Sequence, residues 1–206
     1  MPSSFEARFA KMVDREEIRD LVCKERFARD QGHWEVMAEC FHPDAHIRTS
    51  WYNGTGADYV PATQKLMAAV PGGKHWVFPG FVQVNGDRAT VESPGMIFNR
   101  IVLEGVEVDY QVFCRYQSRV ERREDVWRLM TFEVIFERDI MRAMDPAIPL
   151  PIDPKLLATY RPTYRFLAYL QDRRGFNLSH DLLGDDRPEA LAKFHEGENA
   201  WLHELA

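Results

Sequence analysis

Alternating apolar and polar positions between residues 74 and 139 predict a sheet of neighbouring strands. Strand-like runs cover residues 74–84, 88–103, 106–121 and 126–139. In the third run every second residue from Val106 to Tyr116 is apolar, which is the period of a half-buried strand. Turn residues separate the runs, among them Asn85-Gly86, a strong hairpin signal. We therefore expect an antiparallel meander over this part of the chain.

A helical pattern precedes these strands. Asp14 is the predicted N-cap of a first helix, with Glu17 as its reciprocal partner three residues later, and Gly32 is the predicted end. Further elements are a helix at 34–41, a short strand at 46–51 and a helix at 57–70. Helices followed by a meander are typical of an α+β fold in which the helices pack on one sheet face.

The chain changes character after Met144. Four prolines between residues 145 and 154 exclude a helix or an inner strand and indicate an extended strap. Helices are expected beyond it at 161–173 and 187–205. We interpret residues 1–144 as one α+β domain and residues 145–206 as a proline-rich strap and helical extension. This extension is expected to cover its own domain or a neighbouring subunit.

Charge and composition narrow the class of protein. The chain of 206 residues has 26 Lys and Arg against 32 Asp and Glu, a net charge of −6, so no basic excess favours nucleic acid. It has no apolar run long enough to span a bilayer and no secretory signal pattern. Three scattered cysteines without metal spacing suit reduced thiols. We expect a cytoplasmic protein without nucleic-acid or membrane partners.

Three stretches of the sequence together are similar to a known family. They are Glu17–Val22 with Asp30–Trp34 and Cys40–Ala45, then Lys74–Trp76 with Val82–Ala89, and finally Tyr116–Leu129. Over about residues 8–142 the chain resembles the SnoaL-like (polyketide cyclase-like) branch of the nuclear-transport-factor-2-like superfamily. The resemblance implies a cone-shaped α+β barrel, in which a curved antiparallel sheet wraps the N-terminal helices and leaves a blind apolar pocket. Its members include scytalone dehydratase, a bile-acid dehydratase, lindane dehydrochlorinase, isomerases, cyclases and non-catalytic proteins.

The resemblance points to Asp30 and His75 as a catalytic pair. In the dehydratase and dehydrochlorinase members, an aspartate just past the first long helix pairs with a histidine that opens the first long strand. Asp30 and His75 occupy these positions. A histidine can take a proton in a dry pocket while a carboxylate fixes its tautomer and stabilises the imidazolium. The alternative is that Asp30 only caps a turn and His75 is a hydrogen-bonded core residue.

Further polar and aromatic residues are candidates for substrate binding. Glu25 lies on the apolar face of the first helix, either as a pocket carboxylate or as a partner of an arginine. Three polar residues within apolar strands are expected to orient substrate; they are Asn99, Arg115 and Glu133. The alternative for Arg115 and Glu133 is a salt bridge on an exposed sheet face. Aromatic residues expected at the pocket roof and mouth are Trp51, Tyr52, Tyr59 and Trp76.

These candidates predict a cofactor-independent lyase. It would eliminate water, halide or an aldehyde from an apolar aromatic or polycyclic small molecule. No metal is expected, because His42 and His46 have no third ligand at a supporting spacing. The alternatives are an isomerase or cyclase, or a non-catalytic binding or assembly module in which Asp30 and His75 lie more than ~6 Å apart or point away from a cavity. We also expect a homodimer or homotrimer formed through the exposed sheet face and the tail.

Overall fold

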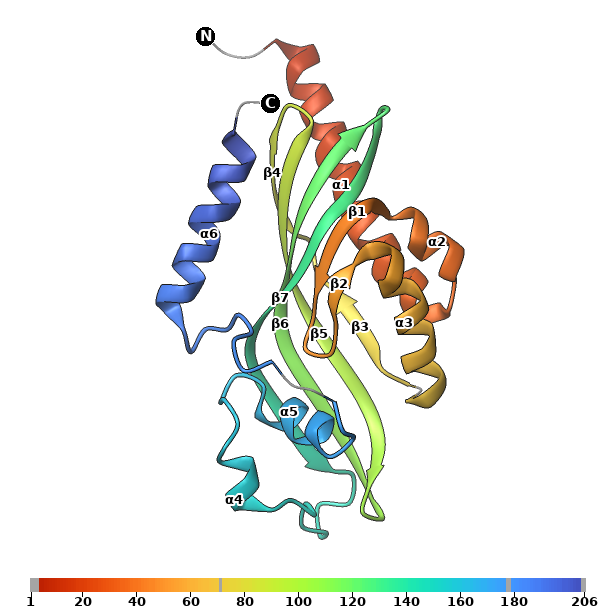
Figure 1. The fold of residues 1–206 in the computed structure, drawn as a ribbon, viewed down its shortest axis with the longest axis vertical. Helices are drawn as coiled ribbons and strands as arrows, with labels where there is room; N and C mark the ends of the chain where they lie inside the picture. Colours follow the sequence, from red (N-terminus) through yellow and green to blue (C-terminus); the bar gives the residue numbers. More distant parts are fainter. Residues whose placement is uncertain (1–3, 71, 177–178, 205–206) are drawn as a thin grey trace.

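A strongly curved sheet forms the centre of the protein, with helices on both of its sides (Figure 1). The computed structural model describes residues 4–70, 72–176 and 179–204. The strands are β1 (Phe41–Arg48), β2 (Asn53–Thr55), β3 (Lys74–Val77), β4 (Phe81–Asn85), β5 (Arg88–Leu103), β6 (Val106–Arg123) and β7 (Val126–Ala143). The helices are α1 (Phe5–Gln31), α2 (Trp34–Glu39), α3 (Gly56–Ala69), α4 (Pro154–Leu157), α5 (Arg165–Asp172) and α6 (Pro188–His203).

The sheet is open rather than closed. Its strand order is β2-β1-β7-β6-β5-β3, and β4 also pairs with β5. Neighbours are antiparallel except β1 and β7, which run parallel. The predicted α+β class is confirmed. The sheet was expected to be antiparallel, and it differs from that expectation in one parallel pair, β1 with β7.

The period-2 pattern of β6 decides which side chains face the helices. Val108, Tyr110, Val112, Cys114 and Tyr116 are all buried, as the alternation predicts. Their neighbours in the strand are mostly half-buried and face the other side of the sheet. The inner face of β6 thus joins the core, and its tyrosines also reach the cavity described below.

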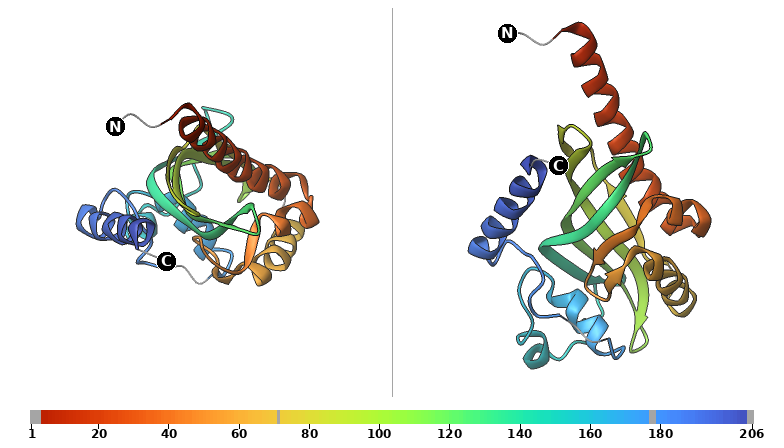
Figure 2. Two further views of the ribbon diagram at one scale, coloured as in Figure 1. Left: turned by 90° about the horizontal axis from the view of Figure 1, so that it is seen from above. Right: turned by 45° about the horizontal axis from the view of Figure 1, so that its top comes forward.

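Helix α1 ends where expected but begins earlier. Gly32 adopts a left-handed φ of 76°, and its N–H donates to the carbonyls of Ala28 and Arg29. The helix starts at Phe5, and the side chain of Ser4 caps it by accepting from the N–H of Ala7. The prediction of Asp14 as N-cap was wrong. Figure 2 shows the start of α1 extending beyond the sheet.

Asp14 instead bonds to the sheet. Its carboxylate accepts hydrogen bonds from Arg122 at 2.7 Å and from the indole N–H of Trp127 at 3.1 Å. Both partners are more than a hundred positions away in the sequence. Asp14 and Glu17 resemble a capping box in the sequence, but Asp14 makes a tertiary contact instead of capping the helix.

Two other boundaries differ from the prediction. Strand β1 begins at Phe41, within the expected second helix, and ends at Arg48. The expected strand 74–84 is two strands, because the segment between β3 and β4 contains Pro79 and Gly80. A Cβ on Gly80 would lie 2.3 Å from Ser93 Oγ, so only glycine allows this close approach.

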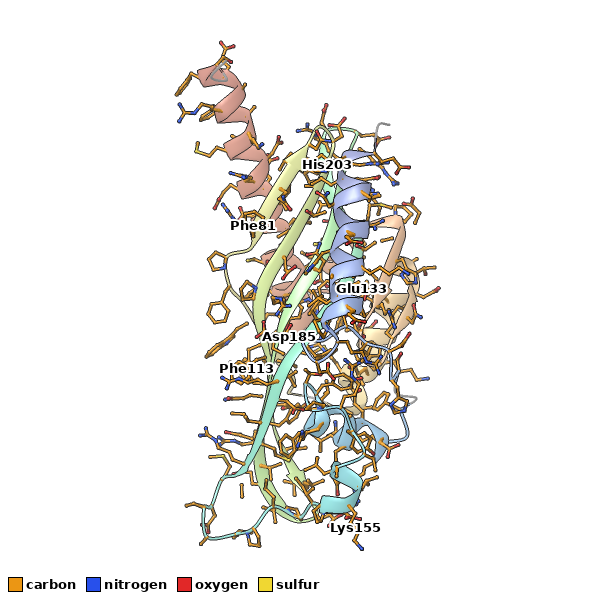
Figure 3. The ribbon with its side chains drawn as sticks, turned by 90° about the vertical axis from the view of Figure 1, so that its left-hand side faces the viewer. Phe81, Phe113, Glu133, Lys155, Asp185 and His203 are labelled. Carbon is orange, nitrogen blue, oxygen red and sulfur yellow. The ribbon has the colours of Figure 1, made fainter. Side chains whose placement is uncertain are left out.

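The C-terminal segment packs on its own domain. Helix α5 lies against the inner side of the sheet, where the rings of Phe136 and Tyr164 are 4.9 Å apart. Helix α6 runs along the other side (Figure 3), where Glu198 accepts hydrogen bonds from Gln117 and Arg119. The predicted helices at 161–173 and 187–205 are thus α5 and α6 with later starts. No helix in the described ranges is both long and apolar enough to cross a membrane.

Candidate active site

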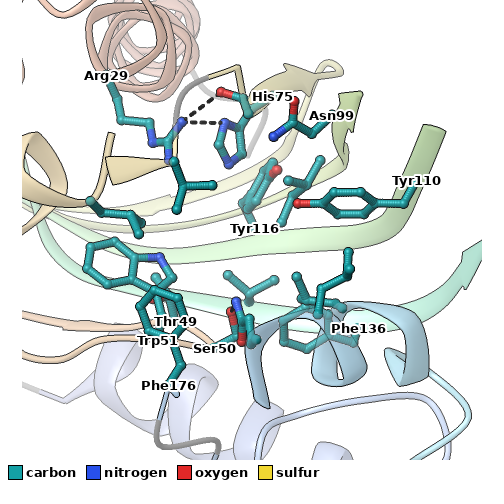
Figure 4. A pocket seen from close by; sticks show the side chains of 18 of the residues that line it. Arg29, Thr49, Ser50, Trp51, His75, Asn99, Tyr110, Tyr116, Phe136 and Phe176 are labelled. Atoms are coloured by element: carbon teal, nitrogen blue, oxygen red, sulfur yellow. Dashed lines mark hydrogen bonds between the residues drawn. The ribbon is translucent and has the colours of Figure 1, made fainter. Parts of the chain in front are cut away.

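A cavity lies between the inner face of the sheet and helices α1, α3 and α5 (Figure 4). Most of its wall is apolar, from Leu66, Val70, Ile97, Phe132, Val134, Phe136, Leu167, Leu170 and Phe176. Polar side chains interrupt this wall, among them Arg26, Arg29, Ser50, His75, Asn99, Tyr110, Tyr116, Gln171 and Arg174. A mostly apolar pocket with a few convergent polar groups is the usual form of a small-molecule site.

Asp30 and His75 meet at the edge of this cavity. His75 Nδ1 lies 2.8 Å from Asp30 Oδ1, and the backbone N–H of His75 donates to Asp30 Oδ2 at 2.6 Å. Asp30 is at the end of α1 and His75 is in β3, so this carboxylate joins the helix to the strand. His75 lines the cavity, whereas Asp30 lies behind it.

The hydrogen bonds assign the tautomer of His75. An ionised carboxylate only accepts hydrogen bonds, so Nδ1 of His75 carries the proton that it donates to Asp30. Nε2 then has a free lone pair, and Figure 4 shows this side of the ring turned towards the cavity. The arrangement presents a neutral imidazole nitrogen to any molecule bound there.

Burial and charge set the protonation states of the pair. Burial, together with the positive charge of Arg29, lowers the pKa of His75 to about 3. Burial alone would raise the pKa of Asp30, but hydrogen bonds from His75 and Arg29 lower it to about 2. At neutral pH the pair is therefore a carboxylate beside a neutral imidazole.

Arg29 holds this pair in place. Its Nη1 donates to Asp30 Oδ1 at 2.8 Å and to the carbonyl of Gly73 at 3.1 Å, and it lies 3.4 Å from His75 Nδ1. Figure 4 shows the guanidinium beside the imidazole. Since the helix places a cation next to Asp30, the carboxylate is fixed in both orientation and charge.

Glu25 is buried but lies outside the cavity. Its side chain forms an ion pair with Arg26, and Nη2 of Arg26 is 2.5 Å from Glu25 Oε1. The prediction that Glu25 contacts substrate is thus not supported by its position; it partners an arginine, as in the alternative interpretation. Arg26 itself lines the cavity, where its guanidinium stacks over Phe132 at 4.4 Å.

The four candidate aromatic residues have different positions. Trp51 and Tyr59 line the cavity and stack with ring centroids 5.8 Å apart. Tyr52 packs against both, but its hydroxyl donates to the Thr55 carbonyl and it does not line the cavity. Trp76 does not line this cavity; it follows the inward His75 in β3 and lies on the opposite side of the strand, beside a second, open depression that Asp30 and His75 also border. Trp76 is 54% exposed.

The three candidate polar residues in the strands also differ in position relative to the cavity. Asn99 lines the cavity. Arg115 faces outwards and pairs with Glu92, Glu137 and Asp185, so the salt-bridge interpretation holds for it. Glu133 also faces away from the cavity, towards α6, where burial raises its pKa to about 7. Neither residue can contact a molecule in the cavity.

Several lining residues were missed by sequence reasoning. Tyr110 and Tyr116 line the cavity but were recognised only as apolar positions of an alternating strand. Gln171 and Arg174 come from the C-terminal extension, which carries no local signal for a binding site. Among the described residues, no group of three or more His, Cys, Asp or Glu side chains is placed to hold a metal ion.

Comparison with known proteins assigns the class. A SnoaL-like domain profile matches residues 10–133, which is most of the chain before the extension. The chain therefore belongs to the SnoaL-like domain family. This fold, with its internal cavity, supports a role in converting a small molecule.

The relatives in sequence are fungal proteins. The chain is 27% identical to pea pathogenicity protein 2 of Fusarium vanettenii over 179 residues, covering 85% of this chain and 77% of that protein. It is 28% identical to a PEP2-like protein of the same fungus over 164 residues, covering 78% of this chain and 70% of the relative.

Solved structures share the fold at lower identity. A hexachlorocyclohexane dehydrochlorinase of Novosphingobium barchaimii has a TM-score of 0.55 at 18% identity, covering 70% of this chain and 99% of its own. A protein provisionally assigned as scytalone dehydratase, from Novosphingobium aromaticivorans, has a TM-score of 0.52 at 19% identity, covering 69% and 97%. These likenesses show that the chain shares the fold of both proteins.

Proposed function

We propose that this protein is a cofactor-independent lyase that eliminates a small group from an apolar, ring-bearing molecule. The supporting observation is the position of the His75 imidazole, which lines the cavity and whose Nδ1 lies 2.8 Å from Oδ1 of Asp30 behind it. The leaving group would be water, a halide or an aldehyde. The aromatic and aliphatic wall suits a substrate with a flat apolar ring.

The proposed reaction begins with proton transfer to His75. For loss of water or halide, Nε2 takes a proton from a substrate carbon, the C–H electron pair forms a carbon–carbon double bond, and the leaving group departs with its own bonding pair. For loss of an aldehyde, Nε2 takes the proton of a hydroxyl group, the O–H electron pair forms the aldehyde C=O, and the pair of the broken carbon–carbon bond stays on the remaining substrate carbon. Asp30 stabilises the resulting imidazolium. The imidazolium then gives its proton to the departing group or to water, which restores the neutral ring.

The low pKa of His75 restricts the substrate. A base of this kind is unprotonated at neutral pH, but it is weak, so the C–H bond that it attacks must be acidified by a neighbouring carbonyl or leaving group. Burial raises the pKa of Tyr116 well above its usual value, so its hydroxyl stays protonated. Its ring centroid is 6.3 Å from that of His75. Tyr116 can therefore donate to an oxygen or halogen that gains negative charge.

Two observations favour this proposal over a non-catalytic module. Such a module leaves Asp30 and His75 apart or directed away from a cavity, whereas here they are hydrogen-bonded and His75 lines the wall. A pair of this kind beside an apolar pocket is typical of a proton-transfer site. An isomerase or cyclase would use the same base without a leaving group, so product mass separates these reactions from elimination.

A substrate screen with matched variants tests the proposal. Cyclic β-hydroxyketones and halogenated cyclohexanes are incubated with the wild type, His75→Ala and the exposed control His203→Ala, and products are analysed by mass spectrometry. We expect loss of water or hydrogen halide with the wild type and the control only. If His75→Ala retains activity within about threefold, the proposed base is wrong. A product of unchanged mass would indicate an isomerase.

A further inference from the structure

The helix α5 supplies one wall of the cavity from outside the part of the chain that matches the family. The SnoaL-like match ends at residue 133, whereas α5 covers Arg165–Asp172. Leu167 and Leu170 give the cavity apolar surface, and Gln171 adds an amide. This wall therefore comes from the extension and not from the part of the chain that matches the family profile.

Gln171 has one amide atom bonded and the other without a partner. The residue is only 8% exposed, and its Nε2 donates to Ser50 Oγ at 2.8 Å. Ser50 also lines the cavity, and it comes from the segment between β1 and β2. The Oε1 atom is buried, and no atom of the described residues forms a hydrogen bond with it. A buried unpaired acceptor is unfavourable in the empty cavity, so this arrangement favours a bound donor.

We propose that Gln171 is a specificity-determining residue that accepts a hydrogen bond from a hydroxyl or N–H group on the substrate. The bond with Ser50 orients the amide so that Oε1 is left for the ligand. The apolar neighbours on α5 exclude water from this bond and make it more selective. The inference rests on the proposed function, since it assumes a ring-bearing substrate in this cavity. Beyond the proposed function, the inference states that the substrate carries a hydroxyl or N–H group on the side that faces α5.

A matched pair of probes tests this inference without knowledge of the substrate. The compounds 2-naphthol and 2-methoxynaphthalene have similar flat rings, but only the first has a hydrogen-bond donor. Their affinities are measured by isothermal titration calorimetry with the wild type, Gln171→Leu, Gln171→Glu and the exposed control Gln64→Leu. Circular dichroism and thermal unfolding show whether each variant is folded. Gln171→Glu keeps an acceptor oxygen, whereas Gln171→Leu keeps only the approximate shape.

We expect the wild type to prefer 2-naphthol by about five- to tenfold, which corresponds to one net hydrogen bond. The preference should fall to within about twofold in Gln171→Leu and persist in Gln171→Glu and Gln64→Leu. Equal affinities in the wild type, a preference for the methoxy compound, or a preference that survives in Gln171→Leu would overturn the inference alone. Failure of both compounds to bind any folded variant would overturn it together with the ring-binding part of the proposed function.

Discussion

Asp30 and His75 are 45 positions apart in the sequence, yet Oδ1 of the first lies 2.8 Å from Nδ1 of the second. The other carboxylate oxygen of Asp30 accepts the backbone N–H of His75. One side chain therefore fixes both the start of β3 and the tautomer of the ring that β3 carries. Because Arg29 also donates to this carboxylate, three donors converge on it.

Replacing Asp30 by asparagine should reverse the tautomer of His75. The backbone N–H of His75 needs an acceptor, so the asparagine oxygen is expected to face it and the amide NH₂ to face Nδ1, while Arg29 keeps its hydrogen bond to the Gly73 carbonyl. The ring then carries its proton on Nε2, and the lone pair that faces the cavity is lost. ¹⁵N NMR of the imidazole reads the tautomer directly. Turnover of a substrate should fall by about 10²- to 10⁴-fold.

The exposed Asp20, on the same helix, provides a control for this variant. Asp20→Asn should leave both the nitrogen shifts and turnover unchanged. A wild-type protein whose His75 already carries its proton on Nε2 would contradict the assigned tautomer.

The pH dependence should show the influence of Arg29 on His75. The neutral ring is the active base, and a pKa of about 3 keeps it neutral far below its ordinary pKa of 6.5. We expect kcat/KM to have no acid limb near pH 6.5. In Arg29→Gln the cation is absent, so the pKa of His75 should rise and an acid limb should move towards neutral pH. Titration of the imidazole Cε1–H signal by NMR checks both statements; an equal or lower pKa in Arg29→Gln would refute them.

The fold and the pair of Asp30 and His75 were predicted from the sequence on different grounds. The strands follow from period-2 alternation, which is a local property of β5 to β7. The contact between Asp30 and His75 came from family resemblance, because no local pattern brings a helix end to a distant strand. Alternation also places Trp76 on the opposite side of β3 from His75, and this relationship follows from the sequence alone.

The remaining errors arise from contacts that depend on the assembled sheet. Glu25 and Arg26 are adjacent residues, yet only Arg26 lines the cavity, because their side chains leave α1 in different directions. The wall formed by Gln171 depends on how the extension folds back over the sheet, which no periodicity records. The sequence therefore identifies inward positions within strands better than it identifies which long side chains reach a cavity.

The pair of Glu25 and Arg26 should be essential for stability. Glu25 is 1% exposed and Arg26 is 3% exposed, and Arg26 also contacts the hydroxyl of Tyr59. Glu25→Gln leaves a buried guanidinium without its counter-charge, which is expected to cost about 3–5 kcal/mol. The exposed pair of Arg19 and Glu16 gives a matched control, in which Glu16→Gln should cost less than ~1 kcal/mol. Urea unfolding measures both losses, and similar values would contradict the proposed role of burial.

Asp139 should make stability depend on pH. It caps α5 by accepting the N–H groups of Phe166 and Leu167, while burial raises its pKa from 3.8 to about 6. A raised pKa means that the folded state binds the proton more tightly than the unfolded state. This residue therefore reduces stability as pH rises from about 4 to 6, by on the order of 3 kcal/mol in total.

Asp139→Asn removes this titration and keeps an oxygen to cap α5. The free energy of unfolding of the variant, relative to that of the wild type, should increase between pH 4 and pH 7 by about 3 kcal/mol. The comparison isolates Asp139, since the lowered pKa of His75 acts in the opposite direction and is common to both proteins. Urea unfolding at each pH gives the values, with the exposed Asp125→Asn as control. A constant difference across this range would refute the argument.

Removal of the extension should change the solubility or the assembly of the protein. We propose that the full chain forms a homodimer or homotrimer through the exposed sheet face and the tail. Trp76, Phe78 and Phe81 are exposed near one sheet edge, which is an apolar surface of the kind that favours association. A chain cut after Met144 also loses α5 and thus uncovers Phe136, now 1% exposed. Light scattering of both chains measures the assembly, and a soluble monomer in each case would contradict the proposal.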